Sequence, residues 1–69
     1  MGTTAALTGP IARGDVETVK GHIEAMQERA PELLDLYREL AKQTIAVAAE
    51  KGGITRQTAK ELRNLVENG

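Results

Sequence analysis

The spacing of apolar residues along the chain predicts helices. In residues 16–30, apolar side chains recur every three or four positions, at Val16, Val19, Ile23, Met26 and Ala30. This spacing places them on one face of an α-helix. Asp15 directly precedes the segment, and its carboxylate can accept hydrogen bonds from the free N–H groups of a first helical turn. We therefore predict a helix over about residues 16–30, capped by Asp15.

A longer helix is predicted over about residues 31–51. Pro31 suits the first helical position, and Gly52 can adopt the left-handed conformation that ends a helix. Two apolar stripes run along this segment, and Leu36 extends the apolar surface. One stripe consists of Leu33, Tyr37, Leu40, Thr44 and Val47, and the other of Leu34, Ala41, Ile45 and Ala48. A single antiparallel neighbour cannot cover so wide a face. We therefore expect this helix to be buried among several others or in a dimer.

A last helix is predicted over about residues 56–68, with Thr55 as its cap. Its apolar stripe consists of Ala59, Leu62, Leu65 and Val66. Residues before Gly9 show no periodicity and are expected to be extended or frayed. Nothing in the chain alternates as a half-buried strand does. The sequence thus predicts an all-α fold of three helices, in a single domain over residues 1–69.

The composition leaves few ways to stabilise so short a chain. Its 69 residues include no Phe, Trp or Cys and one Tyr, so the core is aliphatic and disulfides are excluded. The single His22 cannot build a metal site alone, and no metal is predicted. Small domains are usually stabilised by disulfides, a metal or a partner. We therefore expect a homodimer, with Leu40, Ile45 and Ala48 of the second predicted helix as candidate interface residues.

The distribution of charge excludes several classes of function. The formal net charge is −1, and basic and acidic residues are interspersed, which disfavours binding to nucleic acid. No apolar run approaches the roughly 20 residues of a membrane span, so no membrane partner is predicted. No signal peptide is visible at the start of the chain. The absence of cysteine fits a reducing compartment, and the expected location is cytoplasmic.

Candidate chemistry concentrates in the stretch ALTGPIARGD, residues 6–15. One interpretation is a plain loop that leads into a helix. The alternative is an anion site, in which free N–H groups of the helix start act with the Arg13 guanidinium. Asp15 would compete with an anion for the same N–H groups. Thr18 and His22 lie one helical turn apart and extend this polar face. No pair of nucleophile and base is recognisable, and catalytic residues cannot be named.

These residues carry a resemblance to a family. The segments ALTGPIARGDVETVKGHIEAM and LLDLYRELAKQTIAVA resemble DUF2520, the C-terminal helical domain of bacterial oxidoreductase-like proteins. The matching residues are Leu7-Thr8-Gly9-Pro10, Arg13-Gly14-Asp15, Thr18, His22, Leu36-Tyr37-Arg38 and Thr44. The resemblance covers about residues 6–54. In such proteins a Rossmann-like NAD(P)-binding domain precedes the helical domain.

The resemblance implies a helical dimerisation domain of the 6-phosphogluconate dehydrogenase C-terminal-like type. Its layout is similar to that of pyrroline-5-carboxylate and ketopantoate reductases, in which the helical domain also closes one side of the nicotinamide cleft. The residues that would face this cleft are Thr8, Gly9, Pro10, Arg13, Asp15, Thr18 and His22.

The nucleotide-binding half implied by the resemblance has no counterpart in this sequence. The chain contains no GxGxxG motif and no predicted strand, so we expect a C-terminal fragment that holds no cofactor itself. NAD(P) would bind to the Rossmann-like domain of a longer parent protein, whose substrate the resemblance does not name. The alternative is a stand-alone helical module for protein–protein interaction, without an enzymatic parent.

Overall fold

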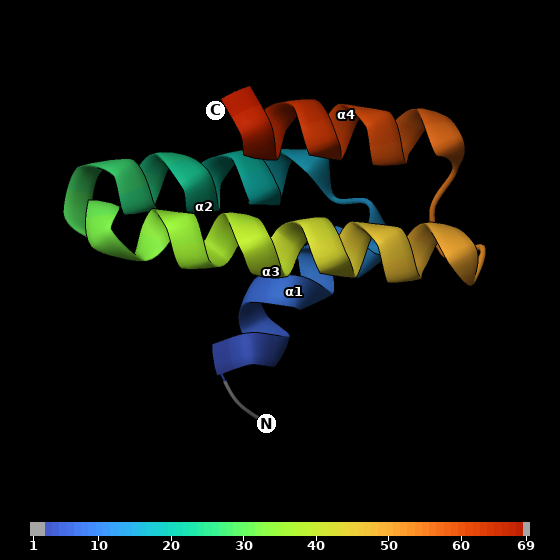
Figure 1. Ribbon diagram of the computed structural model, residues 1–69, viewed down its shortest axis with the longest axis horizontal. Coiled ribbons are helices and arrows are strands. Elements are labelled where there is room, and N and C mark those ends of the chain that lie inside the picture. The colour runs from blue at the N-terminus through green and yellow to red at the C-terminus, as the bar shows by residue number, and fades with distance from the viewer. Residues whose placement is uncertain (1–2, 69) are drawn as a thin grey trace.

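Four helices make up the computed structural model, which describes residues 3–68 (Figure 1). They are α1 (Thr3–Arg13), α2 (Val16–Arg29), α3 (Pro31–Glu50) and α4 (Arg56–Asn68). No strand occurs among these described residues, and the all-α class expected from the sequence is confirmed. Helices α2, α3 and α4 occupy the segments in which the apolar pattern predicts helices.

Helix α1 is the element that the sequence pattern missed. The prediction of extended or frayed residues before Gly9 is wrong for residues 3–8, and so is the count of three helices. Pro10 lies inside α1, where a proline removes a backbone hydrogen bond and lowers helix stability. Both Pro10 and Ile11 are buried, and Ile11 is 0% exposed. Packing against the rest of the chain therefore outweighs the poor local propensity of this segment.

A tight turn at Gly14 joins α1 to α2. Gly14 has a φ of +73°, a left-handed conformation that side chains other than glycine rarely adopt. A Cβ atom at this position would lie only 3.0 Å from Cγ2 of Thr58 and 3.2 Å from Cγ2 of Ile54. The Asp15 N–H donates to the Pro10 carbonyl at 2.8 Å and closes the end of α1. Glycine thus allows both the turn and its close packing against the start of α4.

The residues that the sequence predicts at the ends of the helices occupy those places in the structure. The Thr58 N–H donates to Oγ1 of Thr55 at 3.1 Å, which caps α4. Pro31 is the first residue of α3, and Gly52, just beyond its end, has a φ of +77°. These ends fix the lengths of the helices and therefore which side chains each helix can bring to the core.

Helix α3 lies at the centre of the fold and packs against α1, α2 and α4. It runs antiparallel to α2, and α4 lies along the same pair of helices (Figure 1). Ala41 and Ile45 of α3 are completely buried. The core consists of Ile11, Val19, Ile23, Leu34, Tyr37, Ala41, Ile45, Ala48, Ile54, Ala59, Leu62 and Val66. One apolar stripe of α3 is thus covered by three neighbouring helices within the same chain.

Candidate functional site

The residues predicted to face a cleft lie at the corner between α1 and α2. Thr8, Gly9, Pro10 and Arg13 belong to the last turns of α1, so the expected loop over this segment is helical as far as Arg13. The side chain of Arg13 folds back along α1. Its Nη1 lies 3.1 Å from the position that a Cβ atom of Gly9 would occupy. Pro10 is buried and faces the core rather than solvent.

The rest of this corner is organised around the carboxylate of Asp15. The Thr18 N–H donates to Oδ1 of Asp15 at 3.2 Å, and the Thr18 hydroxyl donates to Oδ2 at 2.7 Å. The bonds from the Thr18 hydroxyl and N–H hold the pKa of Asp15 below its ordinary value, and the charges of Arg13 and His22 lower it further. Asp15 therefore occupies the place at the start of α2 that an external anion would take.

The cap at Asp15 predicts how stability depends on pH. Its pKa is lowered in the folded chain from the ordinary value of 3.8, so the unfolded chain takes up a proton first as the pH falls. The contribution of Asp15 to the free energy of unfolding is fully present above pH 3.8. It is expected to disappear as the pH falls through the lower pKa that Asp15 has in the folded chain. Urea unfolding of the unmodified chain and of Asp15→Asn across this range measures the effect. An equal loss in both chains would show that Asp15 is not its source.

His22 and Tyr37 form a second polar pair, between α2 and α3. Their rings meet edge to face, with centroids 6.4 Å apart and planes at 85°. Tyr37 is only 3% exposed, and burial raises the pKa of its phenol above the ordinary value of 10.0. Nδ1 of His22 and the hydroxyl oxygen of Tyr37 are buried and have no hydrogen-bond partner. From the sequence, Tyr37 had no assigned site role beyond its place in the Leu-Tyr-Arg motif.

Removal of the Tyr37 hydroxyl is expected to preserve or increase stability. A buried hydroxyl without a partner carries a desolvation cost, whereas Phe keeps the ring and its contact with His22. We expect Tyr37→Phe to change the free energy of unfolding by between zero and about 1 kcal/mol in the stabilising direction, as measured in urea. Tyr37→Leu, which also loses the ring contact, is the control and should be less stable than either chain. Destabilisation by Phe would instead reveal a hydrogen bond to the hydroxyl.

A second candidate surface lies on α3. Leu33, Leu36 and Val47 are exposed by 49%, 68% and 53%, and the half-buried Leu40 lies between them on the same helical face. We call Leu33, Leu36, Leu40 and Val47 the α3 surface. Of the interface residues expected from the sequence, Leu40 belongs to this surface. Ile45 and Ala48 are 0% and 8% exposed and pack inside the chain.

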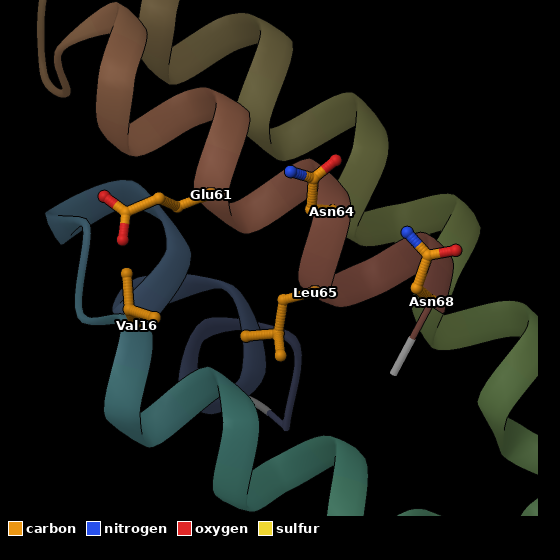
Figure 2. A pocket seen from close by; sticks show the side chains of 5 residues that line it. All are labelled: Val16, Glu61, Asn64, Leu65 and Asn68. Atoms are coloured by element: carbon orange, nitrogen blue, oxygen red, sulfur yellow. The ribbon is translucent and has the colours of Figure 1, made fainter.

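Neither of two shallow hollows on the described part of the chain is lined by a predicted cleft residue. The larger one, of about 630 Å³, lies between the start of α2 and α4 (Figure 2). It is lined by Val16, Glu61, Asn64, Leu65 and Asn68. The smaller one, of about 320 Å³, lies between α3 and α4 and is lined by Asp35, Arg38, Glu39, Lys42, Val66 and Glu67. Within residues 3–68, no cluster of three or more His, Asp or Glu side chains could hold a metal ion. Over the same residues, no helix has both the length and the apolar character needed to span a bilayer.

The chain is thus all-α over the described residues, with a polar corner between α1 and α2 and an exposed apolar surface on α3. Residues 1–44 match the family described as a domain of unknown function, DUF2520, and the chain belongs to this family. The matched part includes α1, α2 and more than half of α3, and so contains all seven cleft candidates. No curated protein and no solved structure matches the chain.

Proposed function

We propose that this chain is a dimerisation domain that pairs with a second copy through the α3 surface. The observation that carries the proposal is the exposure of Leu33, Leu36 and Val47 on a single helix face. Contiguous exposed apolar surface on a small protein commonly marks a binding interface. A second copy is the commonest partner for such a face, because two-fold pairing makes a surface its own complement.

Sedimentation equilibrium of the unmodified chain at micromolar concentration tests the pairing. A dimer is expected. A well-folded monomer would refute the proposal, and a complex formed only with a different protein would support a stand-alone module for protein–protein interaction. The same exposed residues favour that second candidate, so the oligomeric state of the isolated chain separates the two.

We further propose that the α1–α2 corner forms one wall of a ligand cleft in an NAD(P)-dependent oxidoreductase. Membership of DUF2520 supports this role through the family resemblance, and the polar side chains of Arg13, Asp15, Thr18 and His22 at one corner are compatible with it. In this proposal the nucleotide binds to a Rossmann-like domain of a longer parent protein, and the helical chain itself holds no cofactor.

Substitutions at the corner of the full-length natural gene product test the cleft wall. Arg13 is exposed and His22 is half-buried, so Arg13→Ala and His22→Ala should leave thermal unfolding within a few degrees of the unmodified protein. Both are expected to weaken binding of NADPH or of a substrate analogue, measured by calorimetry. The exposed Lys20→Ala on the same helix is the control. A large loss of stability with intact ligand binding would contradict the assignment.

A further inference from the structure

The polar side chains at the α1–α2 corner differ in whether they already have partners. Asp15 accepts hydrogen bonds from the N–H and the hydroxyl of Thr18. Nδ1 of His22 is buried, and the imidazole ring packs edge to face against Tyr37. Arg13 is exposed, and no hydrogen bond or ion pair joins its guanidinium to another described residue. Arg13 therefore has N–H donors that this corner can offer to a ligand.

Gly9 determines where the guanidinium of Arg13 can lie. The side chain of Arg13 folds back toward Gly9, which lies one turn earlier in α1. A Cβ atom at Gly9 would lie 3.1 Å from Nη1 of Arg13, and no described atom of α2, α3 or α4 lies within 4 Å of that position. Ordinary van der Waals contacts are longer than this distance, so a methyl group at Gly9 would displace the guanidinium. The missing side chain thus leaves the space against α1 that the guanidinium occupies.

Two features of the structure account for a glycine at this position. Glycine stabilises a helix less than alanine does, so Gly9 lowers the intrinsic stability of α1. Its place before Pro10 is one reason for it, because a proline ring crowds the Cβ atom of a helical residue that precedes it. The space for the Arg13 guanidinium is the second reason. The first concerns the backbone and the second a side chain, so they predict different results when Arg13 is removed.

We infer that Gly9 positions the guanidinium of Arg13 to bind an anionic group of the ligand, a carboxylate or a phosphate. This inference rests on the proposed cleft wall. A guanidinium is planar and always charged, and its N–H groups can bond two oxygens of either anion at once. A guanidinium that already lies against α1 loses less conformational freedom when the ligand binds. Gly9 is thus a positioning residue, and Arg13 is the residue that contacts the ligand.

Calorimetry on the full-length natural gene product tests the role of Arg13 with two probes. NADPH is titrated into the protein, and oxalate, a small dicarboxylate, is titrated in the presence of saturating NADPH. We expect Arg13→Ala to weaken binding of one probe by about tenfold or more, because a hydrogen bond between charged groups is lost. Weaker binding of NADPH identifies a phosphate of the cofactor as the anionic group, and weaker binding of oxalate alone identifies a carboxylate. If binding of neither probe is weakened, the inference is overturned.

A double-mutant cycle tests whether Gly9 acts through Arg13. Gly9→Ala alone is expected to weaken binding of the same probe by about threefold or more. In the Arg13→Ala protein it should have no further effect, because the side chain that it displaces is gone. An equal effect in both proteins would show that Gly9 acts through the backbone, and would overturn the inference. The same cycle in a Pro10→Ala protein removes the crowding by the proline ring and keeps the contact with Arg13.

Gly21→Ala is the matched control. It makes the same change at an exposed position of α2, where nothing lies within 4 Å of the added Cβ atom, and it should leave binding of both probes unchanged. Circular dichroism verifies that each variant keeps its helices. An additive effect of Gly9→Ala refutes the positioning role and leaves the proposed cleft wall intact. If neither probe binds to the unmodified protein, or if Arg13→Ala and His22→Ala both leave binding unchanged, the proposed cleft wall fails as well.

Discussion

A chain carrying Ile45→Lys is expected to lose its fold. Ile45 is 0% exposed and lies at the centre of α3, beside the equally buried Ala41. The substitution removes a packed apolar side chain and introduces an ammonium group that has no buried partner, and both changes cost several kcal/mol. A domain of this length has a total stability of roughly 3–10 kcal/mol. Far-UV circular dichroism should therefore report a largely unfolded chain.

The conservative substitution Ile45→Val is the control for this result. It removes one methylene group and should cost about 0.5–1.5 kcal/mol while the fold is kept. If the Lys chain were folded and merely monomeric, Ile45 would belong to an interface between copies instead of the core. Loss of helicity that does not depend on protein concentration would place the effect within the single chain.

Leu36→Asp is expected to have the opposite effect, abolishing association without unfolding the chain. Leu36 is 68% exposed, so its replacement removes little packing from the monomer. In the proposed dimer, two copies of the substitution remove two apolar contacts and add negative charge beside the exposed Glu32 and Glu39. We expect association to weaken by at least about a hundredfold, given about 1.5–3 kcal/mol for each apolar side chain that is no longer buried.

Sedimentation and urea unfolding measure the two effects of Leu36→Asp separately. The free energy of unfolding of the monomer should change by less than about 1 kcal/mol, as is usual for exposed positions. Ala25→Asp, at an exposed position of α2, is the control and should dimerise as the unmodified chain does. A Leu36→Asp chain that still dimerises would exclude the α3 surface as the interface.

Ile45 and Leu36 show what the spacing of apolar residues in α3 does not predict. Both residues lie on the apolar part of α3, and the spacing of side chains assigns each to a wide apolar face. Which part of that face is covered depends on where the neighbouring helices pack. The sequence therefore indicated that α3 has more apolar surface than one neighbour can cover. The structure showed that Leu33, Leu36 and Val47 are the part left over.

The α1–α2 corner likewise combines features that the sequence predicts with features that only the structure shows. The sequence identified Asp15 as a cap and grouped Thr18 and His22 with it, because capping and helical spacing are local properties. The contact between His22 and Tyr37 joins residues of two helices, and no local rule predicts it. Only the packed helices show that Nδ1 of His22 and the hydroxyl oxygen of Tyr37 are buried without a hydrogen-bond partner.

By itself, the sequence determined the all-α class, the segments of α2, α3 and α4, and their caps. These features follow from periodicity and from hydrogen bonds between residues a few positions apart. Only the tertiary structure decided that residues 3–13 are helical, because Gly9 and Pro10 weaken the local signal and burial of Ile11 restores stability. Only the tertiary structure also separated the core stripe of α3 from its exposed surface. That separation depends on contacts between segments that are distant in the sequence. The spacing of apolar residues along one helix does not predict the free energy of such contacts.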